Sequence, residues 1–92
     1  MIVSFKSEDS ERLFNDERVK RWQAIESVAR RKLIMLQAAT KLDDLKLPPG
    51  NRLHKLTEDR EEQHAIRIND QYRVCFVWRD GNAHEVEITD YP

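Results

Sequence analysis

Two adjacent strand patterns lie in the stretch NRLHKLTEDREEQHAIRINDQYRVCFVW (residues 51–78), and they decide the fold of the chain. In Ala65–Asn69, isoleucines alternate with Arg67, and a second alternation in Tyr72–Trp78 contains Arg73. Successive side chains of a strand point to opposite faces of a sheet. If the isoleucines, the valine and the phenylalanine of these strands cover a core, Arg67 and Arg73 stand together on the opposite face.

His54 and Lys55 enter this face from just upstream of the two strands. Arginine grips phosphate or carboxylate with a planar fork of donors, and histidine changes its protonation between about pH 5 and 8. Two arginines and a histidine on an open sheet face therefore suit an anion that must be held and a proton that must be moved. A phosphodiester meets both needs.

Length and charge bound the possible functions. The chain has 92 residues, which predicts one domain over residues 1–92. Its net charge of −1 argues against a non-specific nucleic-acid binder with an excess of basic charge. Contact with RNA must then depend on a local patch, or on a larger assembly that supplies the affinity.

Cysteine and histidine usage favour a reduced, metal-free protein. Cys75 is the single cysteine, so no internal disulfide forms, and we expect a buried or half-buried side chain in a cytoplasmic protein. No signal peptide or membrane-spanning run is apparent, and we expect no membrane contact. His54, His64 and His84 lack metal-ligand spacing, and no glycine-rich phosphate loop is present, so we expect no metal and no cofactor.

The first half of the chain reads as one strand and two helices. Met1–Phe5 is apolar and β-branched, and Ser7 or Ser10 is placed to cap a short helix. A longer helix is predicted over Val19–Ala39, where apolar residues recur at spacings of three and four: Trp22, Ile25, Ala29, Leu33 and Leu36. The basic run on its flank, Arg30 to Lys32, is either a solvated face or a contact with RNA or an acidic partner.

The second half reads as a meander of strands. Thr40–Leu47 is short and irregular or helical, and the Pro-Pro-Gly at 48–50 ends it. An extended piece at Arg52–Leu56 and a polar, exposed loop at Thr57–Gln63 precede the two strands. The turn at Arg79–Asn82 leads into a last strand, Ala83–Tyr91, with Val86 and Ile88 inward and Glu85, Glu87 and Tyr91 outward. Helices packed on one face of such an antiparallel sheet make an α+β fold.

Four stretches together resemble a known family: the opening MIVSF, then PPGNRLHKL, HAIRINDQYRVCFVW and the closing VEITDYP. Over nearly its whole length the sequence is similar to the HigB branch of the RelE/ParE toxins of bacterial type II toxin–antitoxin systems. The resemblance implies a RelE-like microbial RNase fold and a metal-independent endoribonuclease that cleaves mRNA in the A site of the 30S ribosomal subunit. It also implies a HigA-like helix-turn-helix antitoxin as partner, through which alone the toxin would reach operator DNA.

The resemblance also suggests site residues. Its active-site or near-site positions fall on His54, Arg73, Asp90 and Tyr91, and the basic residues expected to contact RNA are Lys55, Arg67 and Arg52. In metal-free RNA cleavage the 2′-hydroxyl loses a proton and attacks phosphorus, and the 5′-oxygen needs a proton as it leaves. His54 would move a proton, Arg73 would hold the phosphate, Tyr91 would stack on a base or donate a proton, and Asp90 would orient a neighbour.

The sequence departs from the family at two places. Thr57 stands where some relatives have lysine three residues after the histidine, and Pro92 follows Asp90 and Tyr91 where the family often ends in histidine. The missing histidine removes one proton donor or acceptor. It bears on catalytic strength and not on the fold.

Other interpretations remain open from the sequence. Arg73 can instead form an ion pair with Glu85 or Glu87, His64 reads as a surface residue at a strand end, and Tyr91 can pack at the sheet edge. At the level of function, a ParE-like toxin would inhibit DNA gyrase by binding, without nuclease activity. A third possibility is an inactive partner that only binds an antitoxin.

Overall fold

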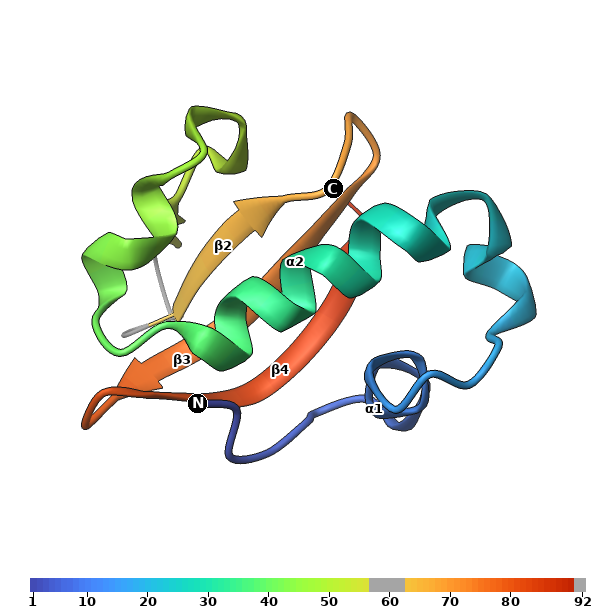
Figure 1. Cartoon of the computed structure of the whole chain (residues 1–92), viewed down its shortest axis with the longest axis horizontal. Helices are drawn as coiled ribbons and strands as arrows, with labels where there is room; N and C mark the ends of the chain where they lie inside the picture. The colour runs from blue at the N-terminus through green and yellow to red at the C-terminus, as the bar shows by residue number, and fades with distance from the viewer. Residues whose placement is uncertain (57–62, 91–92) are drawn as a thin grey trace.

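The computed structural model describes residues 1–56 and 63–90, which form an α+β fold with helices on one face of a sheet (Figure 1). This confirms the predicted fold class. The helical elements are α1 (Glu8–Phe14), the 3-10 turn η1 (Lys20–Ile25), α2 (Glu26–Ala38), and the short 3-10 turns η2 (Leu42–Lys46) and η3 (Pro49–Asn51). The strands are β1 (His54–Lys55), β2 (Gln63–Arg67), β3 (Tyr72–Arg79) and β4 (Asn82–Asp90).

The sheet is a meander in which each strand pairs antiparallel with its neighbour in sequence, in the order β1-β2-β3-β4. The strand that was predicted to begin at Ala65 begins at Gln63, so His64 lies inside β2 opposite Phe76. Its ring stacks on that phenylalanine with centroids 6.2 Å apart. The expectation that His64 is a surface residue at a strand end was therefore wrong. Gln63 and His64 belong to β2, but they continue a polar stretch that reads as a loop.

The N-terminal segment lies along the free edge of β4, but as two isolated parallel bridges and not as the predicted strand. The bridges pair Ile2 with Ala83 and Phe5 with Val86. Between them, Glu85 has a φ of +50°, which interrupts the regular edge, and its N–H donates to the Ser4 hydroxyl at 3.0 Å. An L-residue in this conformation breaks the extended repeat that a continuous ladder needs.

The helical half of the chain is broken where the sequence predicted continuity. Ser7, of the two candidate caps, accepts a hydrogen bond from the Ser10 N–H at 3.3 Å and starts α1. Trp22 has a non-helical φ of −111° and ψ of 17°, so the single helix predicted over Val19–Ala39 is a 3-10 turn followed by α2. Trp22 is buried in the core, and packing of its large ring overrides the helical periodicity of the sequence.

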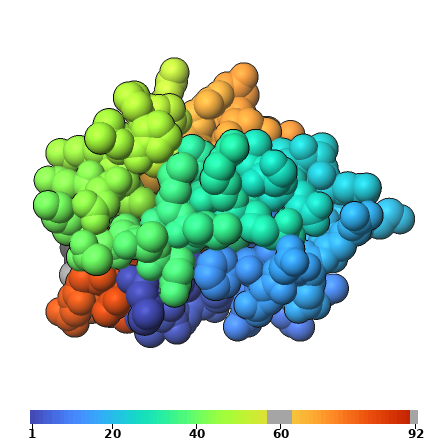
Figure 2. Space-filling view, viewed as in Figure 1, coloured from blue at the N-terminus to red at the C-terminus, as the bar shows by residue number. Residues whose placement is uncertain are grey.

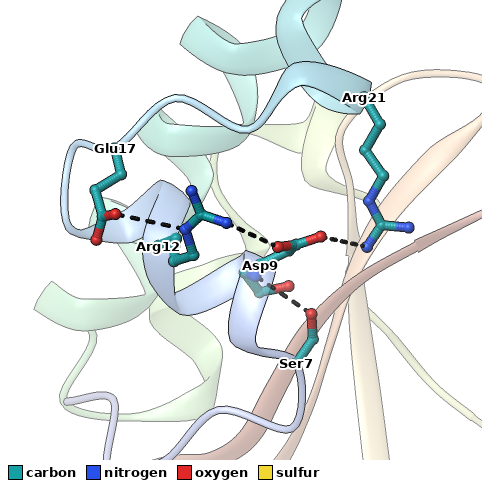
Figure 3. A network of polar contacts seen from close by, with 6 residues as sticks. Ser7, Asp9, Arg12, Glu17 and Arg21 are labelled. Atoms are coloured by element: carbon teal, nitrogen blue, oxygen red, sulfur yellow. Dashed lines mark hydrogen bonds and ion pairs between the residues drawn. The ribbon is translucent and has the colours of Figure 1, made fainter.

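Ion pairs join α1 to the segment that follows it (Figure 3). Arg12 lies 3.6 Å from Asp9 and 3.4 Å from Glu17, and Arg21 lies 3.3 Å from Asp9. Arg30 of α2 reaches the same region and donates to the Leu13 carbonyl at 3.0 Å. Exposed pairs of this kind contribute little individually. The bond from Arg30 is backbone-directed and part-buried, so it helps to fix α1 against α2.

The core lies between α2 and one face of the sheet, and α2 crosses the sheet in front of β3 and β4 (Figure 1). Its fully buried members include Leu13, Ala29, Leu33, Leu36, Ile66, Val74 and Val86. On the helix-bearing side, α2 is flanked by the N-terminal segment and by the η2–η3 region (Figure 2). No helix within the described part of the chain is both long and apolar enough to cross a membrane.

Candidate functional site

The face of the sheet opposite the helices, called here the open face, carries three of the predicted site residues, which lie in two rows across the strands. One row runs His54, Ala65, Cys75 and Glu87 across the strands β1 to β4. In the neighbouring row, Arg73 of β3 lies between Arg67 of β2 and Thr89 of β4, and pairs with both. Paired residues of neighbouring strands share a face. The strands therefore bring His54, Arg67 and Arg73 together, as the alternation in the sequence predicted.

A small apolar floor lies at the middle of the open face. Leu56, Ala65 and Cys75 form a buried cluster separate from the main core. The cysteine is 3% exposed, in agreement with its predicted place in the sheet. Polar side chains that stand around such a floor work in less water than they would on a fully exposed surface, which strengthens their interaction with an anion.

The two arginines occupy directly opposite positions of the β2–β3 pair. Like charges opposite one another across a strand pair destabilise a sheet, because their Cβ atoms are only about 5 Å apart. Asp70, in the turn between the strands, forms an ion pair with Arg67 and offsets part of this repulsion. The guanidinium Nε of Arg73 is buried. An anion that contacts both side chains would further reduce the repulsion, so the pair is a candidate anion-binding position.

His54 is held by the backbone just before it. Arg52 has a left-handed φ of +46°, which turns the chain from η3 into β1. His54 Nδ1 then lies 3.0 Å from the Arg52 carbonyl oxygen. A carbonyl can only accept, so Nδ1 carries the proton of this bond, and in the neutral ring Nε2 keeps its lone pair. The exposed imidazole is therefore oriented with a basic nitrogen available to solvent or substrate.

A buried polar pair supports the segment that leads to His54. Asn51 is 0% exposed and donates to the carbonyls of Leu45, at 3.1 Å, and Leu47, at 3.4 Å. Its side-chain oxygen accepts a hydrogen bond from the Lys32 ammonium on α2. Burial lowers the pKa of Lys32, and the positive charges of Arg31 and Arg67 lower it further. Lys32 thus ties α2 to the η2–η3 connection.

This contact corrects one expectation from the sequence. The basic run was read as a solvated face or a contact with RNA or an acidic partner, but Lys32 is buried. Arg30 bonds to the Leu13 carbonyl and lies 3.4 Å from Glu26. Only Arg31 of the three is exposed. Periodicity did not reveal the role of Lys32, because its partner Asn51 is 19 residues further along the chain, at the end of η3.

Other predicted residues lie apart from the two rows. Lys55 pairs with His64 on the helix side of the sheet, so the expectation that it enters the open face with His54 was wrong, because adjacent residues of a strand point to opposite faces. Asp90 pairs with Tyr72, also on the helix side, and is exposed at the strand end. Arg52 is exposed at the turn before β1. Tyr91 lies outside the described residues. Thr57 and Pro92, the two positions where the sequence departs from the family, also lie outside them.

The histidines are also separated. His64 is on the helix side, whereas His84 pairs with Val77 on the open face, and the strands β2 and β3 lie between His84 and His54. Within residues 1–56 and 63–90, no group of three His, Cys, Asp or Glu side chains is arranged to hold a metal ion.

One basic residue of the open face was missed from the sequence. Lys6 follows Phe5 along the edge of β4, and its ammonium lies 3.5 Å from the Glu87 carboxylate. The parallel pairing of the N-terminal segment places it there. Nothing in the local pattern of MIVSFK ties Lys6 to residues about 80 positions away.

Comparison with known proteins shows the family of the chain. The sequence model of a family described as the RelE-like toxin of the type II toxin–antitoxin system HigB matches residues 3–91. Toxin HigB-1 of Vibrio cholerae serotype O1 (strain ATCC 39315 / El Tor Inaba N16961) is 39% identical over 85 residues, which cover 90% of each chain. An uncharacterized protein of Haemophilus influenzae (strain ATCC 51907 / DSM 11121 / KW20 / Rd) is 32% identical over 59 residues, 64% of this chain and 58% of the relative. The chain belongs to the HigB-like toxins, which are RelE-like toxins of type II toxin–antitoxin systems.

Proposed function

We propose that the protein is a ribosome-dependent endoribonuclease that cleaves mRNA without a metal ion, and that a HigA-like helix-turn-helix antitoxin neutralises it. The proposal depends above all on one observation, the cross-strand pair of Arg67 and Arg73 on the same face as His54. Membership of the HigB-like toxins supports it, because a type II toxin implies an antitoxin partner and the RelE-like family is associated with mRNA cleavage.

The face offers groups for each part of the reaction. From strand spacings, the Cα atoms of His54 and Arg73 lie roughly 12 Å apart, which leaves room for a phosphodiester between the two side chains. His54 Nε2 accepts the proton of the 2′-hydroxyl, whose oxygen then attacks phosphorus. The guanidinium of Arg73 stabilises the charge on the phosphoryl oxygens as the bond to the 5′-oxygen breaks. This leaves a 2′,3′-cyclic phosphate and, once protonated, a 5′-hydroxyl.

Asp90 and Tyr91 stay candidates for the remaining tasks. Asp90 is exposed at the end of β4, where it can orient a neighbouring group or reach past the strand end. Tyr91 follows it directly, and a tyrosine there could stack on an unpaired base and donate a hydrogen bond. We assign the protonation of the leaving 5′-oxygen to Tyr91 or to the conjugate acid of His54.

The weak net charge explains why the ribosome is needed. Affinity for free RNA grows with the number of phosphates that basic side chains neutralise. A chain with a net charge of −1, which already pairs Arg67 with Asp70, offers few such contacts. The ribosome would hold the mRNA in place, so the protein need only bind the bases and phosphates at the site of cleavage.

The test is to induce the protein in bacteria and to map newly formed mRNA 5′ ends, beside a His54→Ala variant produced at the same level. We expect cuts in phase with codons for the natural sequence and none for the variant. DNA damage without mRNA cuts would overturn the proposal in favour of a ParE-like gyrase inhibitor. Absence of any growth effect would instead favour an inactive, antitoxin-binding protein.

A further inference from the structure

The backbone fixes Lys6 beside the open face. Its N–H donates to the Val86 carbonyl at 3.0 Å, and the adjacent Phe5 is bridged to Val86 and packs on the main core. Because Phe5 points to the helix side, the side chain of Lys6 points to the opposite side. Lys6 therefore takes the position of a fifth strand next to β4, although the segment is not a regular strand.

The ion pair with Glu87 confirms this direction. Glu87 pairs with Cys75 on the open face, one row from Thr89 and Arg73, and its carboxylate lies 3.5 Å from the Lys6 ammonium. The side chains of Lys6 and Glu87 are 58% and 26% exposed. Exposed pairs of this kind add little to stability, so the lysine can exchange its partner at small cost.

The charges of Lys6 and Glu87 affect how a phosphate would bind at Arg73. A phosphate bound at Arg73 would lie one row from the Glu87 carboxylate, which repels it. Lys6 neutralises that carboxylate and adds donors on the far side of β4. From strand spacings, its Cα lies roughly 12 Å from that of Arg73, so the two long side chains can contact neighbouring phosphates. The basic surface then runs from His54 through Arg73 to the N-terminal segment.

We propose that Lys6 is an RNA-contact residue, which leaves its exposed pair with Glu87 to bind a phosphate next to the one held by Arg73. The substrate class is a single-stranded RNA backbone, from mRNA or from ribosomal RNA. The inference rests on the proposed function for the identity of the RNA. It adds a binding position that no alternation in the sequence indicates, and Lys55, on the other side of the sheet, does not supply it.

The test compares Lys6→Gln with Lys46→Gln by equilibrium binding to ribosomes and by single-turnover cleavage of mRNA on them. Lys46 is a matched control, since it forms an exposed pair with Asp43 at 3.3 Å in η2, outside the sheet. We expect Lys6→Gln to raise the protein concentration for half-maximal binding and for half-maximal cleavage by about fivefold, with the maximal rate unchanged. The slope of log affinity against log salt should fall by about 0.7, the value for one phosphate of a single strand.

A second variant should change the affinity for ribosomes in the opposite direction. Glu87→Gln removes a negative charge beside the phosphates, so it should tighten binding. Lys46→Gln, whose affinity we expect to be unchanged, is the reference for both variants. Both variants should melt within about 2 °C of the natural sequence, because only an exposed pair is lost. A loss seen with mRNA-programmed ribosomes and not with vacant ribosomes identifies the phosphate as belonging to mRNA, and an equal loss identifies ribosomal RNA.

The outcomes separate this inference from the proposed function. If Lys6→Gln binds and cuts like Lys46→Gln, the proposed Lys6–phosphate contact is wrong and the proposed endoribonuclease function is unaffected. If the natural sequence binds ribosomes but leaves mRNA intact, the proposed endoribonuclease function is wrong, and the comparison of binding still decides the role of Lys6. If the natural sequence does not bind ribosomes at all, both are overturned.

Discussion

Arg73 lies on the open face, directly between Arg67 of β2 and Thr89 of β4. Its position opposite Arg67 is unfavourable for the sheet alone, and the surrounding apolar floor strengthens any interaction with a bound anion. We therefore propose that Arg73 binds the phosphate. Glu87, which was one of its alternative partners from the sequence, lies 3.5 Å from Lys6.

Replacement of Arg73 should separate binding from folding. Arg73→Ala should lower the single-turnover cleavage rate on programmed ribosomes by about 100-fold, because it removes a donor aimed at the developing charge. Arg73→Lys should recover only part of the rate, since a point charge does not reproduce the planar fork. We expect Arg73→Ala to lose about 1 kcal/mol of unfolding free energy in a denaturant titration. The exposed Arg18→Ala serves as control; equal rates for Arg73→Ala and Arg18→Ala would contradict the assignment.

The sequence predicted part of this site for a simple reason. Alternation has a period of two, so the shared face of Arg67 and Arg73 followed from parity as soon as both strands were recognised. The face on which Lys55 lies could not be predicted in this way, because β1 has only two residues and shows no alternating pattern. Lys6 could not be placed either, since its position depends on pairing between segments about 80 residues apart.

At the scale of elements, the η2–η3 connection positions the start of the sheet. Its geometry depends on the buried side chain of Asn51, which donates to two backbone carbonyls and accepts a hydrogen bond from the Lys32 ammonium. The sequence showed only a Pro-Pro-Gly break here, and a break says where a helix stops without saying what fills the space beyond it. The same limitation applied to the predicted long helix, where burial of Trp22 bends the chain.

Asn51→Ala should therefore destabilise the protein more than its position in a loop suggests. The change removes the donors to the Leu45 and Leu47 carbonyls and leaves the Lys32 charge buried without its acceptor. We expect a loss of about 3 kcal/mol in the free energy of unfolding, measured in urea. The exposed Gln23→Ala should change it by no more than about 0.5 kcal/mol. A loss for Asn51→Ala as small as that of the control would show that the buried network is not needed.

At the scale of the whole molecule, the sheet separates two tasks. One face supports the core beneath α2, and the other presents cationic side chains with a polar edge closed by the N-terminal segment. The α+β class followed from the order of helical and strand patterns along the chain. The edge role of Met1–Phe5 did not, because an apolar, β-branched pentapeptide is compatible with any position in the sheet.

The low net charge and the small number of cations on the open face together predict an enzyme that depends on its target assembly. The most direct measurement incubates the purified protein with one mRNA in two forms, naked and bound to programmed ribosomes, at physiological salt, and maps the 5′ ends. We predict cuts only on the ribosome, in phase with the codon in the A site, and their loss in His54→Ala. Efficient cutting of the naked mRNA, or an intact mRNA on ribosomes that have bound the protein, would contradict it.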